Sequence, residues 1–426
     1  DENLRLSLAG QHQADELAAG LPYVLPFYNL RAWSLSALGF QETAVACQRE
    51  AVKIAEETRS LRLIAYAYIY QGRTYAKRGW FAEAVASAQH GINIGWKLGN
   101  DGTGQDFVHT GLLSLGHIQR SAGNFSDAIK SFDKVIDFYQ HSKKQAYFYG
   151  AAKGRLLTLI AQKNNAAARE ELDRVLALYE RFRESIREES NRNSFFDQEQ
   201  STYDVAINFA YTVLNDPVQA YRYVELSRAR SLLDEMEGGI EEIAGPQSPE
   251  LLISMRARPT GVEEISRQIP TQVQLVEYAV LDDKLIIWLI SKDDFVGRVV
   301  NISATELNET VGRYLSSLRQ KPGKTDQRWR EQAKNLYGLL VRPITDLLNQ
   351  QKQVCVIPDK ILTQLPFSTL ISQDTGRLLL EDYLISYSSS ANVFLELTAR
   401  ARSKESVIEE HLLSVGNPQF NQAAFP

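Results

Sequence analysis

The chain has 426 residues, of which 44% are hydrophobic and 23% are charged, and its formal net charge is -5. This balance is typical of a globular protein and excludes both a highly charged disordered chain and a strongly basic nucleic-acid-binding surface. The length predicts two or three domains, each large enough to bury its own core. No apolar run approaches the roughly 18 residues that span a bilayer, and no signal-peptide pattern opens the chain.

Cysteine and histidine usage indicates a reducing compartment without a metal site. The two cysteines, Cys47 and Cys355, are far apart and lack CxxC spacing, so neither a disulfide framework nor a cysteine zinc site is expected. The six histidines form no HExxH-like pair. We therefore expect a cytoplasmic protein that binds neither metal, membrane nor nucleic acid.

The first half of the chain contains an internal repeat. Residues 72–84 and 116–128 match at two glycines, a phenylalanine and an alanine, and every matched position lies 44 residues from its counterpart. The spacing from Gly72 to Ala84 recurs upstream from Gly39 to Ala51. Two degenerate copies follow, one around Leu159, Ala168 and Leu172, the other around Tyr211, Ala220 and Val224.

This pattern predicts stacked pairs of antiparallel helices. Small residues such as Gly72 and Ala84 let two helices approach closely, while Tyr75 and Phe81 fill the space to the next pair. The spacing resembles tetratricopeptide (TPR) repeats, with at least one period longer than usual. We expect an all-α solenoid of about five repeats within residues 1–236.

Partner binding in such an array is expected on the concave face, which first-helix residues line. In the TPR frame these positions carry aromatic, amide and basic side chains that suit a peptide or a partner helix. They are Asn29, Trp33, Tyr66, Arg73, His117 and Arg120.

The pattern changes after residue 236. Glycine and proline punctuate residues 237–262, which predicts a linker, and residues 263–426 then form a second domain. Two β-rich runs within residues 274–291 meet at Asp282 and Asp283, as in a hairpin, and a third short strand, "GRVVNIS", follows.

Helices alternate with strands in the rest of this domain. Ser303 and Glu306 have capping-box spacing before a helix whose apolar face carries Leu307, Val311, Tyr314, Leu315 and Leu318. The segment "WREQAKNLYGLLVRPITDLL" predicts a helix kinked at Pro343. Strands are expected at residues 354–357, 383–388 and 412–415, with Ser390 capping a helix after the second. This alternation predicts an α/β sandwich with its central strands covered on both faces.

Four segments together carry a family resemblance. They are "YRYVELSRARSLLDEM", "VIPDKILTQLPFSTL", "LLLEDYLISYSSSANVF" and "LLSVGNPQF". In this order they resemble the connector and N-terminal half of a CHAT domain, a caspase-like peptidase module that often follows TPR repeats. The resemblance implies a cysteine peptidase related to caspases and separases, with a His-Cys dyad, no metal and no small-molecule cofactor.

The resemblance implies that the dyad lies beyond this chain. In the family the histidine and cysteine follow later strands, after the Gly-Asn-Pro turn, so both are expected after Pro426, and no residue here matches them. Cys355 lies in an apolar strand, where burial disfavours the thiolate. Ser388, Ser389 and Ser390 suit turn and capping duty better than substrate contact. The expected border of the substrate cleft is Gly416, Asn417, Pro418, Gln419 and Phe420.

Two functions remain open on the sequence. The first is a peptidase that cleaves a protein partner recruited or sensed by the repeats. The second is an adaptor with TPR repeats and a non-catalytic CHAT module. A C-terminal fragment that completes the α/β domain is a further expected partner, because an uncovered sheet edge invites aggregation.

Overall fold

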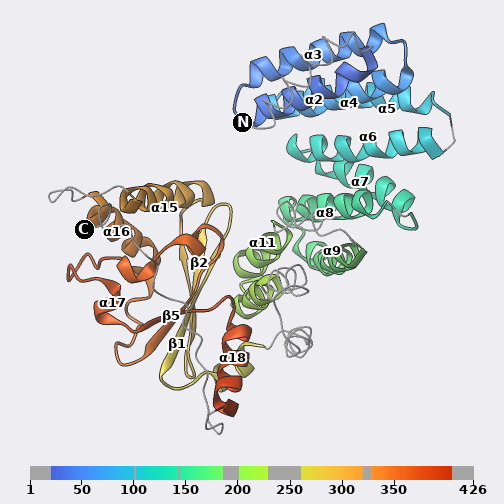
Figure 1. Cartoon of the computed structure of the whole chain (residues 1–426). Helices are drawn as coiled ribbons and strands as arrows, with labels where there is room; N and C mark the ends of the chain where they lie inside the picture. The colour runs from blue at the N-terminus through green and yellow to red at the C-terminus, as the bar shows by residue number, and fades with distance from the viewer. Residues whose placement is uncertain are drawn as a thin grey trace. The chain divides into compact units, whose positions relative to one another are not determined.

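The computed structural model describes residues 21–99, 102–142, 144–185, 201–228, 261–319 and 328–404. Its contacts divide the chain into two compact units, Asp1–Thr202 and Tyr203–Pro426. The first unit is helical, and the second contains the sheet (Figure 1).

The described part of the first unit consists of paired helices. The pairs are α2 (Leu21–Ala37) with α3 (Gln41–Glu57), α4 (Leu61–Arg78) with α5 (Phe81–Trp96), α6 (Gly102–Ser121) with α7 (Phe125–Tyr139), and α8 (Gln145–Ala161) with α9 (Asn165–Ser185). The second helix of each pair also packs against the first helix of the next pair. This is the stacked arrangement that the repeat pattern predicted.

In each pair, the turn between the two helices contains one residue whose backbone adopts the left-handed conformation. These residues are Gly39 (φ 88°), Gly79 (φ 90°), Gly123 (φ 78°) and Lys163 (φ 59°). The amide that follows each turn residue donates to a carbonyl five residues earlier, as from Trp80 to Tyr75 at 2.9 Å. This Schellman pattern satisfies the last carbonyls of the first helix.

The turns correct the predicted register of the first repeat. The sequence match equated Gly39 with Gly72, but Gly39 is the counterpart of the turn residue Gly79. Ala32, buried within α2, occupies the place of Gly72. The prediction was wrong because a spacing between two small residues does not distinguish a glycine inside a helix from one that ends it.

Small residues do allow the close helix packing that we predicted. A Cβ atom added to Gly72 would lie 2.7 Å from the carbonyl oxygen of Ala84. The Phe132 ring lies between Gly116 and Gly154, and Cβ atoms added there would approach it to 2.7 and 2.5 Å. These positions therefore exclude any larger side chain.

A fifth pair also turns at a left-handed residue but lies in the second unit, and there the amide of Asp216 donates to the Ala210 carbonyl six residues earlier. It consists of α11 (Ser201–Asn208), continued by a π-helical segment (Phe209–Val213), and a helix at residues 217–228. Asn215 is its left-handed residue (φ 52°), and Ala220 is buried five residues later, like Ala84 after Gly79. The division by contacts thus precedes the expected boundary at residue 236, which stays a prediction because residues 229–260 lie outside the described part.

The second unit has a five-stranded mixed sheet in the order β3-β2-β1-β4-β5. The strands are β1 (Val273–Val280), β2 (Leu285–Ile290), β3 (Phe295–Val300), β4 (Gln353–Ile357) and β5 (Ile385–Tyr387). Strands β1, β2 and β3 are antiparallel neighbours, whereas β4 is parallel to β1, and β5 is parallel to β4. The predicted hairpin at Asp282 and Asp283 is confirmed.

Helices surround the sheet as predicted for a sandwich. They are α14 (Val262–Gln268), α15 (Ala304–Arg319), α16 (Arg328–Leu340), α17 (Leu379–Asp382) and α18 (Ala391–Lys404), with 3-10 turns at Arg342–Ile344, Lys360–Gln364 and Phe367–Thr369. On one face, Tyr278 and Ile287 share a core with residues of α15 and α16. On the other, the Trp288 ring packs against Tyr211 and Tyr221 of the fifth pair. Strands β1 and β2 are consequently buried throughout (Figure 1).

Helix ends in the second unit show both confirmed and wrong predictions. The Ser303 hydroxyl accepts the Glu306 amide at 3.2 Å, so the predicted cap forms. Leu318, predicted on the apolar face, is exposed because it lies in the last turn of α15. Helix α16 ends at Leu340 instead of continuing through a kink at Pro343, and a 3-10 turn follows, because proline cannot donate the next helical hydrogen bond.

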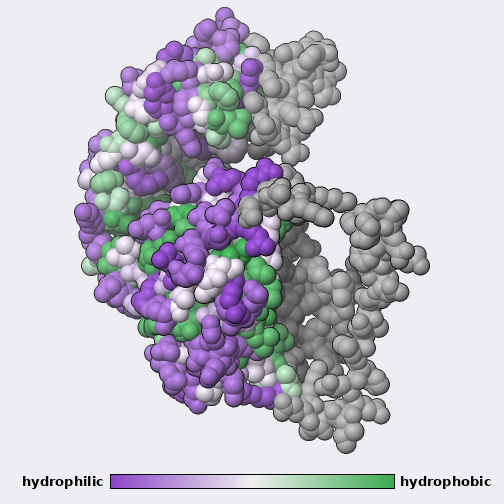
Figure 2. Space-filling model, turned by 90° about the vertical axis from the view of Figure 1, so that its left-hand side faces the viewer, coloured by the Kyte–Doolittle hydropathy of each residue, from purple (hydrophilic) through white to green (hydrophobic). Residues whose placement is uncertain are grey.

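The surface is mixed in polarity. On the face drawn in Figure 2, hydrophilic side chains dominate and hydrophobic ones form separate patches among them, as on an ordinary globular protein. None of the described helices is both long enough and apolar enough to cross a bilayer.

Candidate functional site

The three parallel strands end at one edge of the sheet, which we call the carboxyl edge. Strand β1 ends at Val280, β4 at Ile357 and β5 at Tyr387. Open α/β sheets bind ligands beside the carboxyl ends of their strands, so this edge is the first candidate site.

The loop after β4 is tied to the end of β1. The Asp359 carboxylate accepts the Val280 amide at 2.8 Å. Lys360 donates to the Val280 carbonyl and to the Asp204 carboxylate of α11, the latter at 2.8 Å. The "PDK" sequence therefore fixes the end of β1 relative to β4 and to the fifth helix pair.

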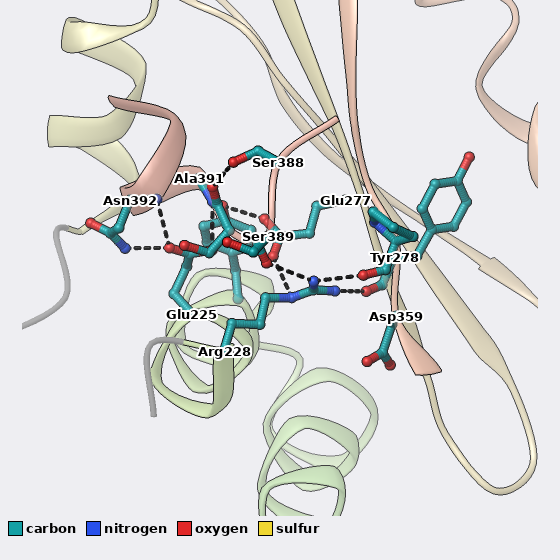
Figure 3. Close-up of polar contacts among 12 residues, drawn as sticks. Glu225, Arg228, Glu277, Tyr278, Asp359, Ser388, Ser389, Ala391 and Asn392 are labelled. Atoms are coloured by element: carbon teal, nitrogen blue, oxygen red, sulfur yellow. Dashed lines mark hydrogen bonds and ion pairs between the residues drawn. The ribbon is translucent and has the colours of Figure 1, made fainter. Parts of the chain in front are cut away.

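Arg228, on the helix that includes residues 217–228, binds backbone carbonyls at or near the ends of all three strands. Its guanidinium donates to the carbonyls of Tyr278 in β1 and of Pro358 after β4, the latter at 2.8 Å. It also donates to the Ser389 carbonyl after β5 at 3.2 Å. Figure 3 shows the Arg228 side chain extended along these strand ends. One side chain thus sets the relative positions of three strands.

A buried ion pair holds Arg228 in place. Its Nε atom lies 2.8 Å from Oε1 of Glu277, a residue in the middle of β1 whose side chain is 0% exposed. The Tyr221 hydroxyl donates to the other carboxylate oxygen at 2.7 Å. Burial and the nearby Glu225 raise the pKa of Glu277 above its ordinary range, and the Arg228 guanidinium opposes that rise.

Glu225, on the same helix as Arg228, binds the start of α18. Its carboxylate accepts the amides of Ala391 and Asn392 at 3.1 and 3.0 Å, and also the Asn392 side-chain amide (Figure 3). A carboxylate at a helix N-terminus meets free amides and the positive end of the helix dipole. The Ser390 hydroxyl accepts the Val393 amide at 3.1 Å, which confirms the predicted cap.

Asp204 is a further acidic group at this edge, and it is half-buried. Burial raises its pKa to about 6, while the neighbouring Lys360 ammonium lowers it and Asp359 raises it. The Asp204 side chain is 18% exposed, so its ion pair with Lys360 is partly desolvated.

The described side chains of the carboxyl edge hold backbone segments in place, and no two of them form a catalytic pair. The Ser388 hydroxyl donates to the Ser390 carbonyl at 2.9 Å, and the charged residues bind strand ends or helix starts. No described group of three or more His, Cys, Asp or Glu residues could hold a metal ion. The expected strand 412–415 and the expected cleft border, Gly416 to Phe420, lie outside the described residues.

Cys355 is buried, and Cys47 is half-buried. Cys355 is buried in β4, and burial raises the pKa of its thiol to about 11, against the weaker effect of a hydrogen bond with Ser386. The Cys47 sulfur lies 3.5 Å from the Tyr28 carbonyl, and burial raises its pKa too. Neither thiol has the lowered pKa that a nucleophile needs.

A second candidate site lies in the first unit, on the face formed by the first helices of the pairs. A hollow of about 640 Å³ lies between α2 and α4, and one of about 420 Å³ lies between α4, α6 and the start of α8. Both are lined by the same stripe of α4, namely Arg62, Tyr66, Tyr70 and Arg73. We call the two hollows together the α4 groove.

Four of the predicted partner-binding residues line this groove. They are Asn29, Trp33, Tyr66 and Arg73. Trp33 is 50% exposed, and Asn29 also accepts a hydrogen bond from Gln48 of α3 at 2.9 Å. The other two, His117 and Arg120, are half-buried on α6 and line neither hollow. Their partner-binding role, like that of the first four, stays a prediction.

Sequence reasoning missed the residues that organise the carboxyl edge. Glu277 stands within a continuous apolar strand, and a carboxylate there requires a buried cation. That signal could have found the pair with Arg228. In the groove, Arg62 and Tyr70 were missed, although they lie eight residues apart on one face of α4.

The chain has paired helices that stack on one another, and an α/β unit with an open mixed sheet follows them. This architecture is that of a helical-repeat protein fused to an α/β domain. Residues 330–426 match the family model described as the CHAT domain. The chain thus combines helical repeats with a segment, residues 330–426, that matches the CHAT domain, which is a caspase-like family.

Solved structures similar to this chain are helical-repeat proteins. BtubC (BKLC) from P. vanneervenii is 15% identical, with a TM-score of 0.41, over 57% of this chain and 93% of its own. Two structures of kinesin light chain TPR-like repeats from Podosopora anserina are each 16% identical, with TM-scores of 0.34 and 0.33. They cover 43% and 42% of this chain and 96% and 95% of their own. A comparison with curated proteins gave no match.

Proposed function

We propose that this chain is the recognition and scaffold part of a caspase-like cysteine peptidase that cleaves a protein partner. One observation carries the proposal: Arg228 binds the ends of all three parallel strands, at the edge where an α/β sheet places its site. The CHAT match supplies the class of chemistry. The proposed His-Cys dyad is carried by polypeptide that follows Pro426.

In this proposal the described residues supply geometry and later residues supply the reacting groups. A cysteine thiolate, formed by transfer of its proton to histidine, attacks the scissile carbonyl, the C–N bond breaks, and the leaving amine takes the proton from histidine. Water then hydrolyses the thioester, which releases the carboxylic acid and restores the thiol. Such a reaction depends on holding the reacting atoms within fractions of an ångström. Arg228, Glu277 and Asp359 would provide that precision by fixing β1, β4 and β5 to one another.

The experiment is a comparison of protein N-termini. The full-length protein that contains this chain is incubated with an extract of its source organism, and new N-termini are identified by mass spectrometry. We expect new termini at one or a few sites with the unmodified protein, and none after the proposed nucleophilic cysteine is replaced by alanine. Termini that persist in this variant would contradict the proposal.

A second candidate function, a non-catalytic adaptor, is favoured by a different observation. The described part of the carboxyl edge holds no nucleophile beside a base, whereas the repeats carry the α4 groove. An adaptor would capture a partner and produce no new N-termini with either protein, so the same experiment separates the two functions.

A further inference from the structure

The α4 groove crosses three neighbouring first helices. Helix α4 packs against α2 on one side and α6 on the other. The same four α4 residues line both hollows, so they form a ridge between them. We treat the two hollows as one site that this ridge divides. The three helices therefore offer a continuous surface instead of two separate pockets.

Two cations on the ridge lack acidic partners. The Arg62 guanidinium lies 5.3 Å from the centre of the Phe107 ring, and that of Arg73 lies 5.3 Å from the centre of the Tyr70 ring. Neither arginine forms an ion pair within the described ranges, although both are exposed. Stacking on an aromatic ring holds a guanidinium in place while its N–H groups stay available for an anion.

The charge of the groove is one-sided. Its lining residues include Arg62, Arg73 and Lys144 but a single acidic residue, Asp106, which already pairs with Lys144. The chain as a whole has a net charge of -5, so this positive surface is a local feature. It favours a ligand of opposite charge.

The positive surface continues onto the next first helix. Burial, and after it the charges of Arg120, Arg73 and Lys153, lower the pKa of His117 to about 4. The Nε atom of Arg120 is buried and has no hydrogen-bond partner within the described part of the chain.

The groove also needs an apolar ligand group. Between the two arginines the ridge presents Tyr66, which is 37% exposed, and Tyr70, and Leu30 and Trp33 line the facing wall. Arg62 and Arg73 are 11 positions apart, or about 16 Å along a helix. An extended peptide spans that distance in about five residues.

We propose that the α4 groove binds an acidic, extended segment of a protein partner, with carboxylates at Arg62 and Arg73 and an apolar side chain between them on Tyr66 and Tyr70. The proposal rests on the proposed recruiting role of the repeats and names its ligand. Its apolar wall fits a peptide better than a nucleic acid, whose affinity comes chiefly from many phosphate contacts.

The test is selection from a displayed library of random peptides on the full chain, followed by fluorescence anisotropy with the selected peptides. The groove variant carries Arg62→Gln and Arg73→Gln. The matched control carries Lys134→Gln and Arg169→Gln, which remove the same charge from exposed sites on the second helices α7 and α9. Circular dichroism melting verifies that both variants fold.

We expect selected peptides with acidic residues on both sides of an aromatic or aliphatic residue. The groove variant should bind them at least tenfold more weakly, and the control should stay within about twofold. The proposal would be overturned if the selected peptides lacked acidic enrichment, or if the control lost as much affinity as the groove variant. It would also be overturned if a single-stranded RNA oligonucleotide bound more tightly than the peptides and the groove variant lost that binding.

The outcome is independent of the proposed peptidase activity. If the groove variant still shows cysteine-dependent cleavage and its peptide binding is unchanged, only the groove proposal is overturned. Groove-dependent peptide binding without any cysteine-dependent cleavage supports the groove proposal and contradicts the peptidase.

Discussion

Arg228 makes the contacts on which the carboxyl edge depends. Replacing it with alanine would leave Glu277 buried without its cation, which typically costs about 3 to 5 kcal/mol. We expect R228A to lower the free energy of unfolding of the second unit by that amount. Hydrogen exchange of the β1 and β4 amides at increasing urea concentration measures this change.

Arg222 provides the matched control on the same helix. It is exposed, and R222A should change the free energy of unfolding by no more than about 0.5 kcal/mol. Lysine at position 228 keeps the charge but not the planar fork, so R228K should recover only part of the loss. Equal effects of R228A and R222A would contradict the role of the ion pair.

Asp204 predicts a pH dependence of stability. Its folded pKa of about 6 lies above the ordinary value of 3.8, because burial outweighs the effect of Lys360. Between about pH 4 and 6 the folded state therefore binds the proton more tightly than the unfolded state does. This contribution to stability is fully present below about pH 4 and is lost as the pH rises through 6.

The D204N variant isolates this effect from other titrating groups. We expect the free energy of unfolding of the unmodified protein, minus that of D204N, to fall as the pH rises from 4 to 6.5 in urea titrations. A difference that stays constant or rises over this range would show that the Asp204 carboxylate is not held in the buried environment described above.

At the scale of the elements, each helix pair depends on its left-handed turn residue. Gly79 has φ 90° and open space around its Cα, so G79A tests backbone strain alone. We expect G79A to destabilise the first unit by about 1 kcal/mol. K163G should act in the opposite direction by a similar amount, because Lys163 occupies the same conformation at φ 59°.

The two variants are compared by urea unfolding of the full chain with far-ultraviolet circular dichroism as the signal. Because both positions are exposed, neither change removes a packed side chain. Loss of stability in K163G, or no change in G79A, would indicate that the turn conformation contributes little to helix pairing.

Local signals in the sequence predicted most of the elements. The hairpin at Asp282, the Ser303 and Ser390 caps and the buried strand β4 each follow from a few neighbouring residues. The sequence was less informative where distant residues decide the outcome. Gly39 was aligned with the wrong repeat position, and Glu277 was not paired, because its partner Arg228 lies about fifty residues away.

The candidate sites were predictable only in part, for the same reason. The concave-face positions came from the repeat frame, and four of them line one groove. The contribution of Arg62 depends on how α2, α4 and α6 lie beside one another, which no single repeat encodes. The carboxyl edge depends on contacts between the fifth helix pair and the sheet, and the sequence, which placed this pair in the repeats and the connector, did not predict those contacts.

For the whole molecule, the fifth helix pair has two roles. Its left-handed turn residue and its buried alanine are those of a repeat, yet Tyr221, Glu225 and Arg228 bind the sheet and the start of α18. The last repeat-like pair is therefore also an outer layer of the α/β sandwich. This explains why Glu225 and Arg228 stand in a segment that resembles a connector.

The reactivity of thiols in the full-length protein tests the proposed peptidase most directly. Limiting iodoacetamide is added at neutral pH, and mass spectrometry identifies the modified cysteines. We expect one fast-reacting cysteine after residue 426, while Cys355 and Cys47 react more slowly in the folded protein, because burial raises the pKa of both thiols. Faster modification of Cys47 or Cys355 than of any later cysteine would contradict this account.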